Sequence, residues 1–306
     1  MTDGTRGGGG SAVLIGVLAL TQLIGWGFSF DFLAVVGRPV ARDLDMANEI
    51  AFAGLSVMMV MAALLGPVVG ARLGRYGAAR VLAEGSVLFA VGLTALSASV
   101  GPVSWLAAWA VVGAGGGFGL MVAANTAVVE RRGAAAKRGI GTLMIFTGLS
   151  AAVSWPIASL LLDGIGWRAT CLVGAAAHVF VCLPAHLFAL PPRPDEIPRA
   201  GPGEASDAPQ RPAGGGTLLV LGVITTAFTF VSYGVSPSLL EIFRLAGASP
   251  ALALQLGSAR SVFGVAARLV DVALGRRSSP LATIIVAGLL IVVGLMLLPI
   301  DRKSVV

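Results

Sequence analysis

Nine long stretches of apolar residues run along this chain, and each of them is about 20 residues long. An α-helix of about 20 residues is roughly 30 Å long, which matches the hydrocarbon thickness of a bilayer. We expect each stretch to be a membrane-spanning helix, because unpaired backbone groups in lipid cost too much free energy and the alternating pattern of a membrane barrel is missing. The stretches cover residues 12–35, 50–71, 82–103, 105–129, 139–162, 169–190, 217–240, 249–274 and 281–299.

The composition agrees with this interpretation. Hydrophobic residues make up 56% of the chain, charged residues make up only 12%, and the mean hydropathy is +0.90. A soluble domain cannot bury so large an apolar fraction. The sequence therefore predicts an all-α fold, a polytopic membrane helical bundle.

Lys and Arg are concentrated at the N-terminus and in alternate loops, which predicts how the bundle is oriented. This set contains Arg6, Arg72, Arg75, Arg80, Arg131, Arg132, Lys137, Arg138, Arg193, Arg199, Arg211, Arg276 and Arg277. The opposite loops hold only Arg38, Arg42, Arg168 and Arg244. Because basic loops stay inside, we expect a cytoplasmic N-terminus. The sequence pI is near 10.3, but basic residues in short, alternate loops form no continuous patch for nucleic acid.

A single polar segment divides the apolar stretches. Six stretches precede residues 191–216, which are rich in Pro and Gly, and three follow. We expect residues 1–190 to form a six-helix N-terminal half, 191–216 a flexible cytoplasmic linker, and 217–300 a partial C-terminal half of three helices. We interpret residues 301–306 as a tail outside the fold, added where a gene sequence ends early.

Cysteine and histidine give no sign of a disulfide, metal or cofactor. Cys171 and Cys182 fall on one predicted helix, about 16 Å apart at a rise of 1.5 Å per residue, which is beyond disulfide reach. The two histidines, His178 and His186, lie on the same helix without metal-ligand spacing. We expect no cofactor.

The segment between the second and third stretches has the sequence GARLGRYGAAR, residues 70–80. It resembles the G-x-x-x-D-R-x-G-R-R loop of the major facilitator superfamily (MFS) of secondary transporters. Gly70, Arg75 and Gly77 match that motif, and Arg80 directly follows its last position. The resemblance implies a gating role for all four residues. The family's acid, which helps to latch the two halves in one gating state, is replaced here by Gly74.

Other segments share this resemblance. Residues 130–141 (ERRGAAAKRGIG) are similar to the family's basic loop before the fifth helix, and Gly166-Trp167-Arg168 resembles the start of the sixth. The resemblance implies an MFS-type bundle whose two halves rock around a midplane site. Family members have twelve helices, so we expect this chain to be truncated after about nine.

Two motifs of drug antiporters are not matched. An arginine of their fourth helix is replaced by Trp109, and Pro156 lies three residues later than in their fifth-helix signature. The nearby glycine cluster follows no strand, so it is not a phosphate loop. We expect it to pack helices closely. The cluster contains Gly113, Gly115, Gly116, Gly117 and Gly119.

Ionisable residues inside the stretches are the main functional signal. Arg260 lies near the middle of the eighth stretch, where an unpaired arginine costs about 2.5 to 3.5 kcal/mol or more. It resembles the eighth-helix arginine with which MFS carriers bind a carboxylate, although a structural pair with Asp31 remains open. Asp31 itself is a candidate for proton coupling, since an apolar site favours a protonated carboxyl. His178 and His186 are either further titrating groups or packed core residues.

Polar residues suggest which side chains line a transport pathway. Thr225, Thr229, Ser232 and Ser236 fall on one face of the seventh stretch, although hydroxyls also bond their own helix backbone. MFS transporters line the pathway with the first, fourth, seventh and tenth helices. Together with Arg260, the predicted substrate-binding residues are Gln22, Trp26, Asn125, Thr229 and Tyr233.

These observations predict a secondary active transporter with alternating access, a proton-coupled carrier of a small, monocarboxylate-like organic anion. Efflux of a drug or another amphipathic solute, and a transporter-like scaffold or sensor without transport, remain as alternatives. The expected partners are a small-molecule solute, H⁺ and the lipid bilayer, in the plasma (inner) membrane of a bacterium. We expect no enzyme, because no nucleophile with a base, metal cluster or nucleotide loop is recognisable.

Overall fold

The chain forms two compact units, Met1–Asp207 and Ala208–Val306. The structure, a computed structural model, describes residues 6–190, most of 239–274 and the isolated positions 216, 220, 223, 286, 288 and 289. The predicted linker, nearly all of the seventh and ninth stretches, and the tail at 301–306 lie outside the described residues.

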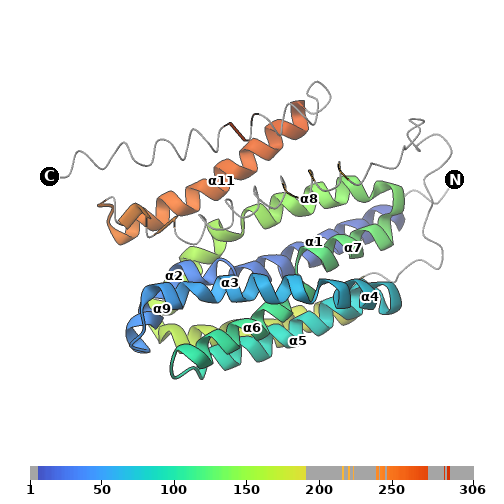
Figure 1. Cartoon of the computed structure of the whole chain (residues 1–306). Coiled ribbons are helices and arrows are strands. Elements are labelled where there is room, and N and C mark those ends of the chain that lie inside the picture. Colours follow the sequence, from blue (N-terminus) through green and yellow to red (C-terminus); the bar gives the residue numbers. More distant parts are fainter. Residues whose placement is uncertain are drawn as a thin grey trace. The chain divides into compact units, whose positions relative to one another are not determined.

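In the first unit, all six predicted spans are helical, but most of them are interrupted (Figure 1). The first, second, fourth and fifth stretches each contain two helices separated by a short break, and the sequence did not predict these breaks. The helices are α1 (Arg6–Gly27), α2 (Phe32–Asp43), α3 (Asn48–Leu64), α4 (Gly66–Tyr76), α5 (Ala78–Ser97), α6 (Pro102–Gly119), α7 (Met121–Arg132), α8 (Ala136–Gly148) and α9 (Ser150–Ala177).

Four helical segments of the described chain are long and apolar enough to cross a membrane. They are Gly10–Asp43, Ala78–Ser97, Pro102–Arg132 and Ala136–Ala189, and the α3–α4 pair, bent by 51°, adds a fifth. The last segment has 54 residues, and a straight helix of that many residues would be about 80 Å long, more than twice the hydrocarbon thickness. Gly166 divides it, because its φ of 77° and ψ of 166° lie outside the helical region. The fifth and sixth predicted spans meet at this glycine.

The sixth span ends in two π-helical segments, η2 (His178–Cys182) and η3 (Ala185–Ala189). Such wider turns are uncommon and often mark functional positions. Both segments pack against α5 and α1.

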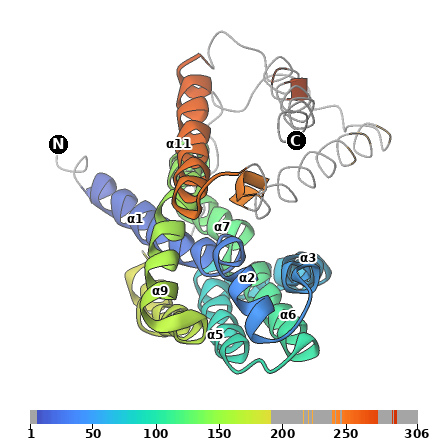
Figure 2. The same cartoon turned by 90° about the vertical axis from the view of Figure 1, so that its left-hand side faces the viewer.

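Glycines let α3, α5 and α6 approach closely, which confirms the packing role predicted for the glycine cluster. A Cβ atom on Gly113 would lie 2.5 Å from the carbonyl oxygen of Met58 on α3. On α5, a Cβ on Gly85 would lie 2.5 Å from the backbone nitrogen of Gly119 at the end of α6. Figure 2 shows these three helices side by side at one edge of the first unit.

A hydrogen-bond network at one end of the unit ties three spans together. Arg168 donates to the carbonyl oxygens of Ser97 and Ser99, at 2.9 and 2.8 Å, and to Oδ2 of Asp43 at 2.8 Å. Trp167 donates to the same Oδ2 at 3.2 Å. Asp43 ends α2, so that helix continues past the predicted span, and Arg38 and Arg42 lie on it rather than in a loop.

In the second unit, α11 (Pro250–Leu274) confirms that the eighth predicted span is helical. On the part of α11 whose side chains are described, 250–266, the buried residues are small or β-branched and recur every four residues, at Ala253, Gly257, Ser261 and Val265. This spacing places them on one face of the helix.

Candidate functional site

Asp31 lies in the turn that separates α1 from α2, and its side chain is only 6% exposed. The backbone N–H of Asp31 donates to the carbonyl oxygen of Trp26 at 3.0 Å. The donor lies five residues after the acceptor instead of four, so this turn is wider than a turn of an α-helix. The first span is thus interrupted at Asp31. This is the only buried acidic residue in the described segment from α1 to α2. An interruption at membrane depth is tolerated only where protein or a water-filled cavity surrounds it.

Helix α9 supplies three hydrogen-bonding side chains to Asp31. Ser150 Oγ donates to Oδ2 of Asp31 at 2.6 Å, and Ser154 Oγ lies 3.3 Å from the same oxygen. Trp155 Nε1 donates to the carbonyl oxygen of Asp31 at 3.0 Å, which holds the turn itself. These three residues lie close together along α9, so one helix face positions both the carboxylate and its backbone.

Close helix approach brings these groups together. A Cβ atom on Gly27, the last residue of α1, would lie 2.9 Å from Cβ of Ser154. A Cβ on Gly174 would lie 2.5 Å from the ring of Phe28. Glycine at these two positions therefore permits α1 and the following turn to lie directly against α9.

The arrangement can hold Asp31 in either protonation state. Serine hydroxyls both donate and accept, and they rotate to suit their partner. They donate to the carboxylate, and they can accept a hydrogen bond from the protonated carboxyl. Both protonation states of Asp31 can therefore keep hydrogen bonds to these two serines.

The fourth span has a similar interruption, at Leu120 between α6 and α7. Gln22 on α1, which is fully buried, donates from Nε2 to the carbonyl oxygen of Gly119 at 2.8 Å. Its Oε1 has no hydrogen-bond partner among the described residues. Gln22 is one of the residues predicted to bind solute. Its Nε2 stabilises the break between α6 and α7, and its Oε1 remains able to accept a hydrogen bond.

The other predicted lining residues of this unit lie on the same two spans. Trp26 is half-buried near the end of α1, and its ring packs edge-on against Phe30 with centroids 5.8 Å apart. Asn125 lies on α7, which packs against α1, and its buried Oδ1 has no partner in the described structure. The structure therefore places Gln22, Trp26 and Asn125 on the neighbouring helices α1 and α7, and their role in a pathway stays a prediction.

The predicted gating loop is mostly helical. Gly70 and Arg75 lie on α4, Arg80 lies in the first turn of α5, and only Gly77 forms the turn, with a φ of 78°. A side chain at this φ is strained, so Gly77 is required by the backbone. Space around Gly70 is open, since a Cβ there would meet nothing within 4 Å.

Two acids missed by sequence reasoning organise this region. Arg72 donates two hydrogen bonds of 2.8 Å to the carboxylate of Glu84. The buried carboxylate of Glu130 accepts from the backbone N–H of Ala78 at 3.1 Å, which caps the start of α5, and Arg131 Nη1 lies 3.3 Å away. Glu84 is 12 residues from Arg72 and Glu130 is 52 residues from Ala78, so no short motif reveals these contacts.

The two histidines are core residues. His178 is 2% exposed and stacks on Phe89 with ring centroids 4.6 Å apart. His186 is 3% exposed, and its Nδ1 lies 3.0 Å from Oγ of Ser86. Both rings face the interface with α5, where they pack between helices.

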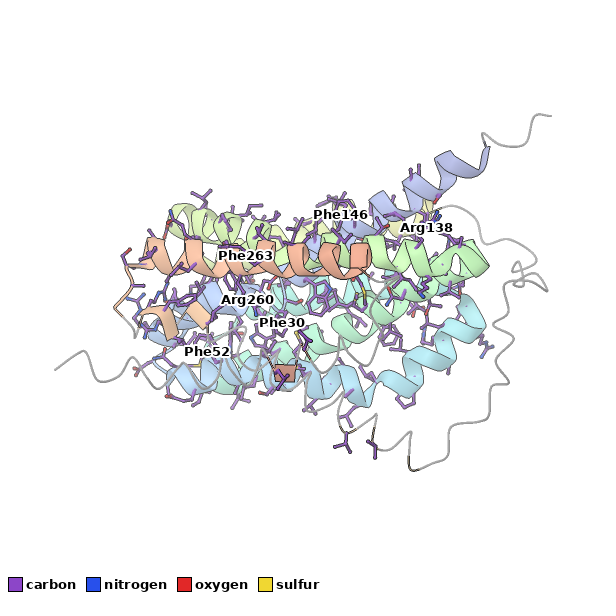
Figure 3. The ribbon with its side chains drawn as sticks, turned by 90° about the horizontal axis from the view of Figure 1, so that it is seen from above. Phe30, Phe52, Arg138, Phe146, Arg260 and Phe263 are labelled. Carbon is purple, nitrogen blue, oxygen red and sulfur yellow. The ribbon has the colours of Figure 1, made fainter. Side chains whose placement is uncertain are left out.

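Three predicted binding residues belong to the second unit. Arg260 lies near the middle of α11 and its side chain is exposed, as is that of Phe263 one turn further on (Figure 3). Thr229 and Tyr233 lie outside the described residues.

Comparisons with known proteins agree with the fold. Residues 18–306 match the family model of the Major Facilitator Superfamily. The solved structure of a D-xylose–proton symporter is similar, with a TM-score of 0.56 and 14% sequence identity over 87% of this chain and 69% of the symporter. No curated protein matches the sequence significantly. At this level of identity, the structural likeness shows a common fold.

Proposed function

This chain belongs to the Major Facilitator Superfamily, and we propose that it is a proton-coupled secondary transporter of a small organic anion. The observation that carries the proposal is the buried carboxyl of Asp31, at the interruption of the first span, with Ser150 and Ser154 as partners. Coupling requires a group that takes up a proton at one stage of the cycle and releases it at another, and this site supports both states.

Proton binding at Asp31 changes the charge at a helix interruption. The charged form accepts hydrogen bonds from α9, whereas the protonated form needs less stabilisation and crosses the membrane at lower cost. Interrupted helices at the midplane are typical of transporters that alternate access by rocking rigid parts around a fixed site. Protonation of Asp31 therefore favours the states in which this part of α1 and α2 is less accessible to water.

Arg260 supports an anionic solute. It lies among apolar residues of α11, with Leu256 one turn before it and Phe263 one turn after it, and both neighbours are exposed. Its planar guanidinium matches a carboxylate, with which it can form two parallel hydrogen bonds. The similar D-xylose–proton symporter is named for proton coupling, which is consistent with the coupling ion proposed here.

The basic residues support a cytoplasmic N-terminus in the plasma membrane. The contacts of Glu130 with Ala78 and Arg131 bring the α4–α5 and α7–α8 turns to one end of the unit. The helix ends beside those two turns hold most of its basic residues, and the Arg168 network marks the other end. By the positive-inside rule, the more basic end faces the cytoplasm.

Solute-driven proton movement tests the proposed function. The full gene product is reconstituted into proteoliposomes that contain a pH-sensitive dye, and small monocarboxylates, sugars and amphipathic drugs are added in turn. A carrier that moves one proton with each monocarboxylate is electroneutral, so internal acidification is the appropriate signal. Acidification with monocarboxylates supports the proposal. Proton movement only with drugs would favour amphipathic efflux, and no response to any solute would favour a non-transporting scaffold.

A further inference from the structure

Three arginines surround one tyrosine where α4 meets α5. The guanidinium carbons of Arg72, Arg75 and Arg80 lie 5.5, 5.2 and 5.2 Å from the ring centroid of Tyr76. Each distance is within the range of cation–π attraction. The ring therefore holds three like charges together, although they repel one another.

The described residues supply too little negative charge to balance this cluster. Glu84 binds Arg72 through both oxygens and lies 3.7 Å from Arg80. Among the described residues, no carboxylate forms a salt bridge with Arg75. Glu130, the other acid at this end, is engaged by Ala78 and Arg131. Three guanidiniums thus share one carboxylate, which leaves a net charge of about +2.

Residue 74 is a glycine, so it adds no negative charge to the cluster. Gly74 is exposed on α4, beside Arg75, and a Cβ atom there would meet nothing within 4 Å. The space next to the cluster is open to an external group. An anion at this place would meet exposed guanidinium groups, since the side chain of Arg80 is 68% exposed.

Exposed apolar side chains precede the cluster at the end of α3 and along α4. Val68 is 47% exposed and Tyr76 is 42% exposed, and both share a face with Arg72 at intervals of four residues. Leu64, at the end of α3, is 67% exposed. Apolar side chains followed by a tyrosine and arginines are typical of a helix that passes from the acyl chains to the headgroup layer.

We propose that Arg75, Tyr76 and Arg80 bind the phosphate headgroup of an anionic lipid, with its acyl chains along the exposed apolar side chains of α3 and α4. The phosphate supplies the negative charge that the cluster lacks. Basic residues near a membrane surface gain about 1 kcal/mol each from anionic lipid, which corresponds to about fivefold in affinity. This inference does not depend on the transported solute or on Asp31.

Native mass spectrometry of the purified full chain tests the proposal. The protein is released from nanodiscs that contain phosphatidylglycerol and phosphatidylcholine, and the two retained lipids are counted. We expect preferential retention of phosphatidylglycerol by the wild type, and a preference about 25-fold weaker in R75Q/R80Q, at about fivefold per lost charge. The matched control K137Q/R138Q removes two exposed charges from α8 at the same end (Figure 3) and should keep the preference.

Further results distinguish a specific lipid site from attraction by total surface charge and from binding of a soluble anion. Gly74→Asp places a carboxylate in the open space, so it should lower the preference while the thermal unfolding temperature in phosphatidylcholine stays unchanged or rises. If K137Q/R138Q lost the preference for phosphatidylglycerol to the same extent as R75Q/R80Q, the lipid would be attracted by total surface charge. That result would overturn the proposal. Unchanged retention in R75Q/R80Q would also overturn it. Displacement of phosphatidylglycerol by millimolar inorganic phosphate would assign the cluster to a soluble anion instead of a lipid.

Discussion

At the residue scale, charged side chains of the first unit contact partners that are distant in sequence. Asp43 and Arg168 are 125 residues apart, and Glu130 and Ala78 are 52 apart. Sequence patterns reveal pairs three or four residues apart on a helix, such as Arg80 and Glu84. Asp31 was predictable as a candidate because it is an acid within an apolar stretch. Its serine partners were not, because serine is common in membrane helices and carries no charge to mark it.

Arg168 provides a stability test at this scale. Arg168→Ala removes hydrogen bonds to two carbonyl oxygens and to Asp43, so we expect the free energy of unfolding to fall by about 1–3 kcal/mol. Asp43→Asn removes only an exposed charge pair and should cost about 0–1 kcal/mol. Denaturant unfolding in detergent measures both, with the exposed Arg138→Ala as the control. Equal stability of Arg168→Ala and Arg138→Ala would contradict the role assigned to the network.

At the element scale, apolar length predicted where helices occur but not where they break. Every described span is helical, yet the first span is interrupted near Asp31 and the fourth at Leu120. Hydropathy measures the cost of burial and is insensitive to backbone geometry. The contacts that stabilise the breaks come from other helices, such as the bond from Gln22 to the carbonyl oxygen of Gly119.

Close helix packing leads to a second prediction. Gly85→Ala would place a methyl group 2.5 Å from the backbone nitrogen of Gly119, and backbone at a helix end cannot move aside as a flexible side chain can. We expect a loss of about 1–3 kcal/mol through overpacking. Gly141→Ala on α8 is the control, since a Cβ there meets nothing within 4 Å. Thermal unfolding in detergent compares the two variants, and similar midpoints would argue against tight α5–α6 packing.

At the scale of the whole molecule, the alternation of basic and neutral turns predicts orientation. Space is open for a side chain at Gly74, in the basic end, and at Gly101, before α6. We expect Gly101→Cys to react with an impermeant maleimide in intact cells and Gly74→Cys to react only after permeabilisation. Both variants are made after replacement of Cys171 and Cys182, which are buried. The reverse labelling pattern would mean that the N-terminus lies outside.

Proton coupling through Asp31 is the central claim, and a comparison of solute exchange with proton-driven accumulation tests it most directly. Both are measured in proteoliposomes that contain the full gene product, with a solute identified by internal acidification. We expect Asp31→Asn to retain exchange, because the amide still accepts from Ser150, and to lose accumulation driven by a pH gradient. The control Asp43→Asn makes the same chemical change outside the site and should retain both activities. Accumulation by Asp31→Asn at the wild-type level would contradict the account.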